Sequence, residues 1–265
     1  MSWQQILLLF IGMGGSFIGV LAGGGGLIIL PAMMLFGIPT HMSIGATKFS
    51  SIVAGSSNLW RLIRDGRITA SNFRFIAIGG FICGMAGAFI TSSLPENILN
   101  VLVVILLLFS LTLMFLPKKH SKQPKPKAAA PTPERKEEPK SGSASASGFS
   151  PGARVLICAI SVYDGLLGAG AATISISTLM YNNFSYIDAV YHTRLLVLMA
   201  SAGAFVVFLY HGFINWHYAI PLMIGSSIGA QFGFIALPHV SPRAARYGLI
   251  IISILLIAQT LLKVL

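Results

Sequence analysis

The sequence predicts an all-helical protein that crosses a membrane several times and consists of two inverted repeats of about five helical segments each. The chain has 265 residues, of which 55% are hydrophobic and 9% charged. Its apolar residues form long runs without amphipathic spacing, such as 101–115 and 247–265. These runs approach the roughly 20 residues needed to cross a bilayer core of about 30 Å. The net charge of +11 does not indicate a nucleic-acid partner, because nearly all of the charge lies in predicted loops.

A polar segment divides the chain into three parts. Residues 117–150 are rich in Lys, Pro, Ala and Ser, with eight cations and three acids and almost no large apolar side chain. This composition predicts a disordered basic linker. The predicted organisation is a first membrane repeat (1–116), a cytoplasmic linker (117–150) that lies along an anionic leaflet, and a second, inverted membrane repeat (151–265).

The two hydrophobic halves match each other without a gap at a shift of 146 positions. This shift places Thr47-Lys48 over Thr193-Arg194 and the turn Gly66-Arg67-Ile68 over Gly212-Phe213-Ile214. Glycine matches arise easily by chance in a glycine-rich chain. A Thr-cation pair that matches in the same register is much less expected by chance. The match predicts an internal repeat of the kind found in secondary transporters.

Within each half the segments follow the same order. A membrane span (4–22 and 152–168) precedes a short apolar helix (26–37 and 171–183). The short helix lacks the length to cross the membrane comfortably, so it is expected to form a hairpin, which could be re-entrant. A third helix, beginning near His41 in the first half, carries the Thr-cation pair, and two more spans follow (75–93 and 98–116 in the first half). The N-terminal segment lacks a basic region and a cleavage motif, so it is interpreted as the first membrane segment and not as a signal peptide. The number of full crossings, eight or ten, is left open.

Loop charges predict how the halves are oriented. The loop 61–74 carries four arginines and the linker eight cations, whereas the turn 94–97 between them has Glu96 and no cation. Because Lys and Arg concentrate on the cytoplasmic side, the loop and the linker are expected inside and both termini outside. In the second half the pattern reverses, with cations in the turn 241–247 and none in the loop 210–217.

Two glycine-rich turns are candidates for binding. Gly23, Gly24, Gly25 and Gly26 precede the first short helix, and Gly168 and Gly170 precede the second. Each glycine weakens a helix by roughly 1 kcal/mol relative to alanine, so such a run suits an unwound turn at membrane depth. Its backbone N–H groups and the following helix N-terminus would favour an anion. Close helix packing through small residues is the alternative explanation.

The two cations of the third helices are the other candidates. Lys48 is expected on the order of 10 Å below its helix start, and Arg194 at the matching depth from the opposite face. Charges at such depth usually face a cavity or a partner, although both side chains could instead extend to the nearer interface. Thr47, Ser51 and Thr193 lie beside them on their helices. Asp164 and His192 could carry protons; equally, Asp164 could be the ion-pair partner of Arg194 with no role in proton transport.

No enzymatic centre is indicated. The six histidines are scattered without ligand spacing, and no pair of acids stands out. Cys83 and Cys158 both lie in apolar runs and are interpreted as packing residues. We therefore expect no catalytic residues, metal or cofactor.

The stretch "GVLAGGGGLIILPAMMLFGIP" with the later "IGATKFSS" resembles the opening of the sulfite exporter TauE/SafE family. Members begin each half with a glycine-rich hairpin, the first followed by a proline. The second hairpin departs from this pattern by placing Ala171 and Ala172 after Gly170. The resemblance implies a prokaryotic inner-membrane permease for sulfite, sulfoacetate or related organosulfonates, with proton coupling left open.

The sequence thus predicts a secondary transporter for a small anion that works by alternating access, and not an enzyme. An anion channel of the same architecture is the alternative. The expected partners are the anionic substrate and the lipid bilayer, without nucleic acid. The identity of the anion, the direction of transport, the coupling ion and homo-oligomerisation are left open.

Overall fold

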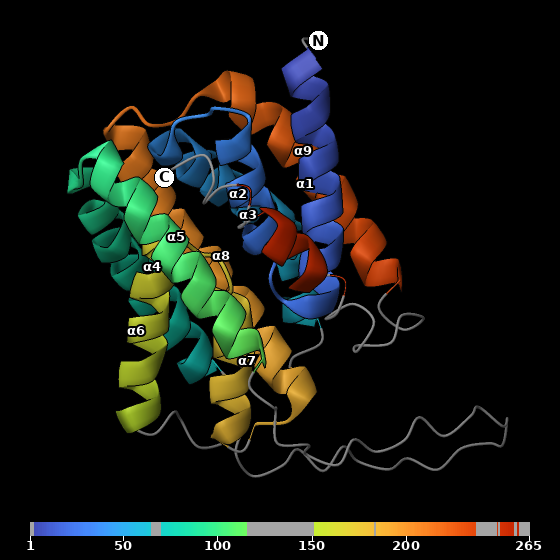
Figure 1. Ribbon diagram of the computed structural model, residues 1–265. Helices are drawn as coiled ribbons and strands as arrows, with labels where there is room; N and C mark the ends of the chain where they lie inside the picture. Colours follow the sequence, from blue (N-terminus) through green and yellow to red (C-terminus); the bar gives the residue numbers. More distant parts are fainter. Residues whose placement is uncertain are drawn as a thin grey trace, which may run out of the picture.

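The structure, a computed structural model, describes residues 3–64, 70–115, 151–182 and 184–236, and residues 248, 250–256 and 259 near the C-terminus. The predicted linker (117–150) and the turn 241–247 lie outside the described residues. All regular secondary structure in the described part is helical, which confirms the predicted fold class (Figure 1). Helical residues 250–256 follow the last of the nine labelled helices.

The helices of the two halves follow the predicted order. The first half contains α1 (Trp3–Ala22), α2 (Gly26–Leu35), α3 (Thr40–Arg64), α4 (Ala70–Ser93) and α5 (Glu96–Phe115). The second contains α6 (Pro151–Leu166), α7 (Ala171–Tyr181), α8 (Tyr186–Tyr210) and α9 (Trp216–Ala236). At a shift of 146 positions, the bounds of α3 coincide with those of α8.

Local sequence explains where these helices end. Gly37 and Gly212 adopt φ angles of 76° and 73°, a left-handed conformation that stops α2 and α8 and favours glycine. At the start of α8, the Ser185 side chain accepts a hydrogen bond from the Asp188 N–H at 3.2 Å and caps the helix. The expected interruption of the first hairpin falls at the glycines, while Pro31 lies inside α2.

Each half packs mainly against the other half. α1 lies along α9, and its counterpart α6 lies along α4, while α3 and α8 contact each other. Figure 1 shows α1 entering from one end of the molecule and α6 from the opposite end, so these corresponding helices run in opposite directions. Exchanging the halves therefore reproduces the main helix contacts, α1 on α9 with α6 on α4, and α4 on α8 with α9 on α3.

Glycines allow these helices to approach closely. A Cβ atom at any of several glycines would collide with a backbone carbonyl of the facing helix, so a larger residue would force the helices apart. The pairs are Gly225 with Leu9 and Gly229 with Met13 for α9 on α1, Gly87 with Val162 for α4 on α6, and Gly84 with Ala200 for α4 on α8.

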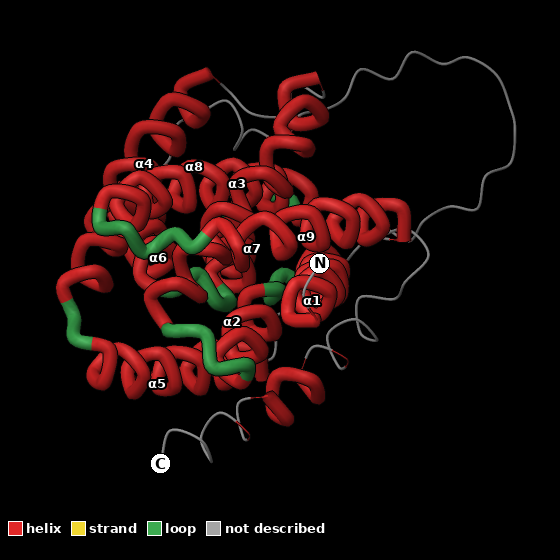
Figure 2. The backbone as a smooth tube through the Cα atoms, turned by 90° about the horizontal axis from the view of Figure 1, so that it is seen from above, coloured by secondary structure: helices red, strands yellow, loops and turns green. Residues whose placement is uncertain are grey.

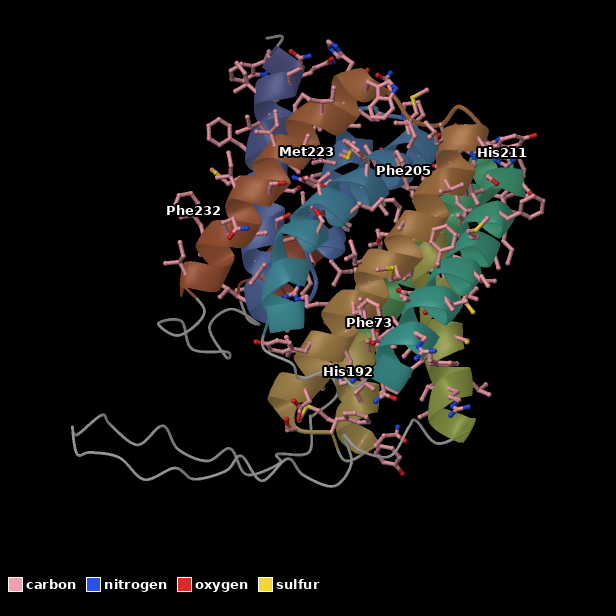
Figure 3. All side chains as sticks on the ribbon, turned by 180° about the vertical axis from the view of Figure 1, so that it is seen from behind. Phe73, His192, Phe205, His211, Met223 and Phe232 are labelled. Atoms are coloured by element: carbon pink, nitrogen blue, oxygen red, sulfur yellow. The ribbon has the colours of Figure 1, made fainter. Side chains whose placement is uncertain are left out.

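The outer surface of the bundle is apolar. Large hydrophobic side chains are exposed on several helices, and Figure 3 shows one of them, Phe232, projecting from α9 away from the bundle. By length and composition, three segments of the described chain qualify as membrane spans: Trp3–Leu21, Asn72–Ser93 and Asp188–Tyr210. An apolar surface of this extent suits a lipid environment.

The two short helices do not have the length of a full span. α2 has 10 residues and α7 has 11, which at 1.5 Å per residue is about half of a 30 Å bilayer core. In the view from above, short loops lie among the helices of the bundle (Figure 2). The turns before α2 and α7 are largely buried, so irregular backbone is enclosed by protein, as a membrane protein requires.

Candidate functional site

The two glycine turns meet inside the bundle. Gly23 in the first turn has a φ of 86°, and Gly168 and Gly170 in the second both have a φ of 79°. A Cβ atom at Gly26 would lie 3.2 Å from the Cα atom of Ala169, so the backbones of the two turns are in direct contact. Thr173 of α7 donates a hydrogen bond from Oγ1 to the carbonyl of Gly23 at 3.2 Å. The first turns of α2 and α7 therefore lie side by side.

The second turn requires glycine for two reasons. At Gly170 the left-handed backbone disfavours any residue with a side chain, and a Cβ atom there would overlap the hydroxyl of Ser110 on α5. The phenol of Tyr163 donates to the carbonyl of Ala169 at 2.7 Å and fixes the turn from the other side. This turn is thus held by contacts from α5 and α6.

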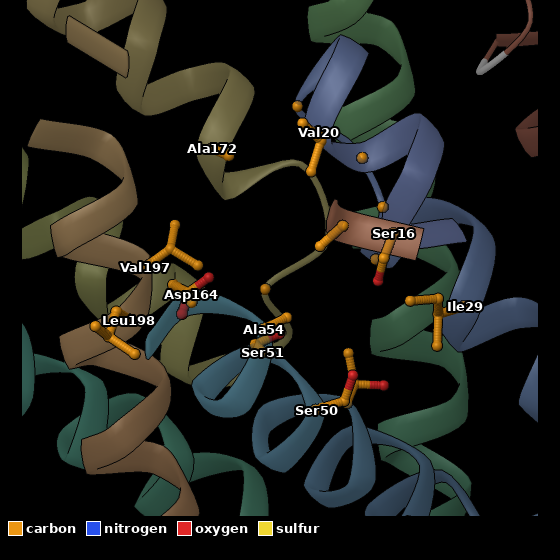
Figure 4. Close-up of a pocket in the computed structure, with 18 of the residues that line it drawn as sticks. Ser16, Val20, Ile29, Ser50, Ser51, Ala54, Asp164, Ala172, Val197 and Leu198 are labelled. Atoms are coloured by element: carbon orange, nitrogen blue, oxygen red, sulfur yellow. The ribbon is translucent and has the colours of Figure 1, made fainter. Parts of the chain in front are cut away.

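A cavity of about 130 Å³ lies beside both turns. Figure 4 shows its lining: Ser50, Ser51 and Ala54 from α3, Ser16 and Val20 from α1, and Val197 and Leu198 from α8. The lining combines hydroxyl groups and glycine backbone with an apolar wall. Such a site has room for a small ligand with a polar head.

Lys48 is buried in the wall of this cavity. Its side chain is 2% exposed, and its Nζ atom lies 3.0 Å from Oδ2 of Asp164. The ammonium group also donates to the backbone carbonyl of Asp164, and Ser201 of α8 donates to Oδ2 at 3.3 Å. The alternative in which Lys48 extends to a membrane interface is therefore not what the structure shows.

Arg194 approaches the same cavity from α8. It lines the cavity and donates a hydrogen bond from its guanidinium group to the carbonyl of Val20 at 3.2 Å. The structure pairs Lys48 directly with Asp164, whereas the sequence had offered Arg194 as one possible partner. The cavity wall thus includes a lysine and an arginine from different halves, of which Lys48 pairs with the carboxylate of Asp164.

The cavity gathers most, but not all, of the predicted site residues. The ones that line it are Gly23, Gly25, Gly26, Thr47, Lys48, Ser51, Asp164, Gly168, Gly170 and Arg194. Gly24, His192 and Thr193 are not among its lining residues. The structure gives positions, while the binding roles of these residues stay predictions.

His192 lies toward the start of α8, at the opposite end of that helix from His211 (Figure 3). Its Nδ1 atom lies 2.7 Å from the carbonyl of Asp188, and its ring packs edge-on against Phe184 with 5.1 Å between centroids. Thr193 is buried at 1% exposure, and its hydroxyl has no hydrogen-bond partner among the described residues.

Several lining residues were not singled out from the sequence. Ser16 lies about one helical turn before Gly19 on α1, and Ser50 directly precedes Ser51 on α3. Serine on an apolar helix is too common to be a signal by itself. Among the described residues, no group of three His, Cys, Asp or Glu side chains could hold a metal ion.

The fold and the cavity together define a polytopic helical membrane protein with a buried, charged site between its two halves. A family model described as sulfite exporter TauE/SafE matches residues 8–260. The chain therefore belongs to the sulfite exporter TauE/SafE family, which confirms the resemblance found in the sequence.

Curated relatives carry transporter names. A "Probable membrane transporter protein" of Haemophilus influenzae is 25% identical over 229 residues, covering 86% of this chain and 82% of the relative. YdhB of Bacillus subtilis, also named a probable membrane transporter protein, is 26% identical over 234 residues, with 86% and 87% covered. YfcA of Escherichia coli, with the same description, is 22% identical over 257 residues, with 96% and 88% covered. No solved structure matches at a significant level. The family and these names indicate a membrane transporter.

Proposed function

We propose that this transporter moves small sulfur-containing anions, such as sulfite, sulfoacetate or other organosulfonates, across a prokaryotic inner membrane by alternating access. The observation that carries the proposal is the cavity that holds Lys48 and Arg194 beside the two glycine turns. Positive side chains and the adjoining N-terminal turns of α2 and α7 favour an anion with several oxygen atoms. The family name supports the choice of sulfur oxyanions.

The shape of the cavity agrees with a ligand that has an apolar body. The walls formed by Val20, Val197 and Leu198 offer no hydrogen bonds from their side chains, while Ser50 and Ser51 do. An organosulfonate presents a charged head and a short carbon chain, so it would satisfy both kinds of wall. The cavity volume of about 130 Å³ suits a small anion of this kind.

The arrangement of the halves supports the alternating-access part of this proposal. The matching bounds of α3 and α8, the exchanged contacts of α1 with α9 and α6 with α4, and the opposite directions of α1 and α6 support inverted repeats around a shared site. In this proposal the halves rock about the cavity. The linker and the arginine-rich loop lie in the cytoplasm and both termini lie outside, as the loop charges predict.

Counterflow of labelled sulfoacetate in proteoliposomes tests this function. The purified protein should accumulate the label in exchange for internal unlabelled anion, and Arg194→Gln should abolish the exchange. Arg74→Gln is the matched control, because Arg74 is exposed on α4 and does not line the cavity. Absence of saturable exchange by the wild type contradicts the proposal. Unitary currents in a bilayer recording would indicate a channel instead.

A further inference from the structure

Within the cavity, the ammonium group of Lys48 is held in an ion pair with Asp164. The ammonium group of Lys48 directs hydrogen bonds to both the carboxylate and the backbone carbonyl of Asp164. Both residues line the cavity, and both are buried, Lys48 at 2% and Asp164 at 1% exposure. Asp164 is therefore an anion of the protein itself, held inside the site that should receive an external anion.

The local chain is built around this pair. Asp164 lies in the last turn of α6, directly before the second glycine turn. A Cβ atom at Gly168 would lie 2.6 Å from Nζ of Lys48 and 3.3 Å from Oδ1 of Asp164. Any side chain at this position would displace the ammonium group, so the glycine leaves the space in which the pair forms.

Several elements contribute polar or charged groups to the cavity or to Asp164 itself. Lys48 comes from α3, and Arg194 comes from α8 together with the hydroxyl of Ser201. On α6 itself, Tyr163 directs its phenol to the carbonyl of Ala169. The cysteine of α4, Cys83, contacts Cys158 instead, and the only titratable group of α7, Tyr181, is exposed at its end.

An external anion and an ionised Asp164 would compete for the same ammonium group. Two like charges that share a buried site disfavour each other strongly, and the usual outcome is that one of them takes up a proton. Sulfonates are much stronger acids than a carboxylic acid, so the proton would go to Asp164.

We propose that Asp164 is the coupling residue of this transporter: it takes up one proton as the transported anion replaces it at Lys48. The proposal rests on the anion-transport function above. The proton is drawn from the acid of the aqueous medium (hydronium or a protonated buffer) on the side from which the anion enters, and it binds a carboxylate oxygen of Asp164, while Lys48 keeps its charge and turns to the anion. When anion and proton leave on the other side, the ion pair forms again. Anion and proton therefore move together in the same direction, one of each per cycle.

Binding titrations with sulfoacetate test the proposal. Its sulfonate and carboxylate stay ionised between about pH 6 and about pH 8, so any pH dependence belongs to the protein. The wild type should bind more tightly as the pH falls, by up to about tenfold per pH unit for one linked proton. Asp164→Asn, which cannot ionise, should bind at least as tightly as the wild type at the acidic end and lose the pH dependence.

Asp188→Asn is the matched control, because Asp188 is an acid of the same chain that lies at the start of α8 outside the cavity lining. It should keep the wild-type slope. A wild type without a slope, or Asp164→Asn with an unchanged slope, overturns the coupling role while leaving anion transport standing. If no form of the protein binds any of the proposed anions at any pH, the transport function itself is wrong, and the coupling role falls with it.

A second measurement does not depend on how the variant folds. In wild-type proteoliposomes with a pH-sensitive dye inside, an inward sulfoacetate gradient should acidify the interior with one proton per anion. Anion uptake without a proton flux overturns the proposal.

Discussion

Lys48 of α3 and Asp164 of α6 lie 116 positions apart in the chain and form an ion pair of 3.0 Å inside the cavity. The pair links the third helix of the first half to the first helix of the second. It also places a carboxylate beside the two glycine turns. This relationship organises the candidate site and underlies the first prediction.

Removing one partner of the pair should destabilise the protein more than removing both. Lys48→Met leaves Asp164 buried without its cation, and such a change costs about 3–5 kcal/mol. The double variant Lys48→Met/Asp164→Leu should recover most of that loss, because no buried charge remains. Thermal unfolding in detergent measures both. Equal stability of Lys48→Met and the wild type would show that the pair does not stabilise the fold.

Two glycines on α1 should respond with opposite sign to the same substitution. At Gly12 a Cβ atom would lie 2.6 Å from the backbone carbonyl of Leu222 on α9, whereas at Gly14 it would meet nothing within 4 Å. Gly12→Ala should therefore lower the melting temperature by forcing α1 and α9 apart. Gly14→Ala should leave it unchanged or raise it slightly, since alanine favours the helix by up to about 1 kcal/mol. Similar melting temperatures for both variants would contradict the close packing.

The second glycine turn should be sensitive to Ser110. Gly170→Ala places a methyl group in the left-handed region and against the Ser110 side chain, whereas Gly37→Ala, at a similar φ of 76°, meets nothing within 4 Å. We expect Gly37→Ala to cost about 1–2 kcal/mol from the backbone alone and Gly170→Ala to cost more.

The double variant Gly170→Ala/Ser110→Gly removes the overlap and should fall back to the loss of Gly37→Ala. Chemical unfolding of the four proteins measures these differences. If the double variant is no better than Gly170→Ala, Ser110 does not determine the shape of the turn.

The two cysteines offer a native crosslink between the halves. Cys83 of α4 and Cys158 of α6 lie on helices that pack against each other, and their thiols interact, so mild oxidation should join them. In a protein with a protease site inserted in residues 117–150, the cleaved halves should migrate together on a non-reducing gel after oxidation. They should separate after reduction, and Cys83→Ser should not crosslink. Separation of the oxidised wild-type halves would contradict the packing of α4 on α6.

The sequence was sufficient to predict the helical segments and the position of the turns. Helix length and apolar runs follow directly from composition, and the shift of 146 positions matches the bounds of α3 and α8. Gly23 and Gly170 indicate the position of their turns, because only glycine freely adopts the positive φ angles found there. Helix lengths, turn glycines and the internal repeat can all be recognised along the sequence without knowing how the helices pack.

The pairing inside the cavity could not be predicted in the same way. Asp164 aligns with Ile18 in the repeat, so the internal match gives no hint that it meets Lys48 and not Arg194. The approach of Ser110 to Gly170 depends equally on how α5 crosses the second turn. Both contacts arise from the relative placement of helices that are distant in the chain, which a single sequence does not contain.

Calorimetric titration of the detergent-purified protein with sulfoacetate and sulfite, repeated on Lys48→Gln and Arg194→Gln, tests most directly whether the cavity is an anion site. The account predicts saturable binding by the wild type, and loss of binding in both variants while Arg74→Gln binds normally. Binding that survives in folded Lys48→Gln and Arg194→Gln proteins would place the anion elsewhere and contradict the central claim.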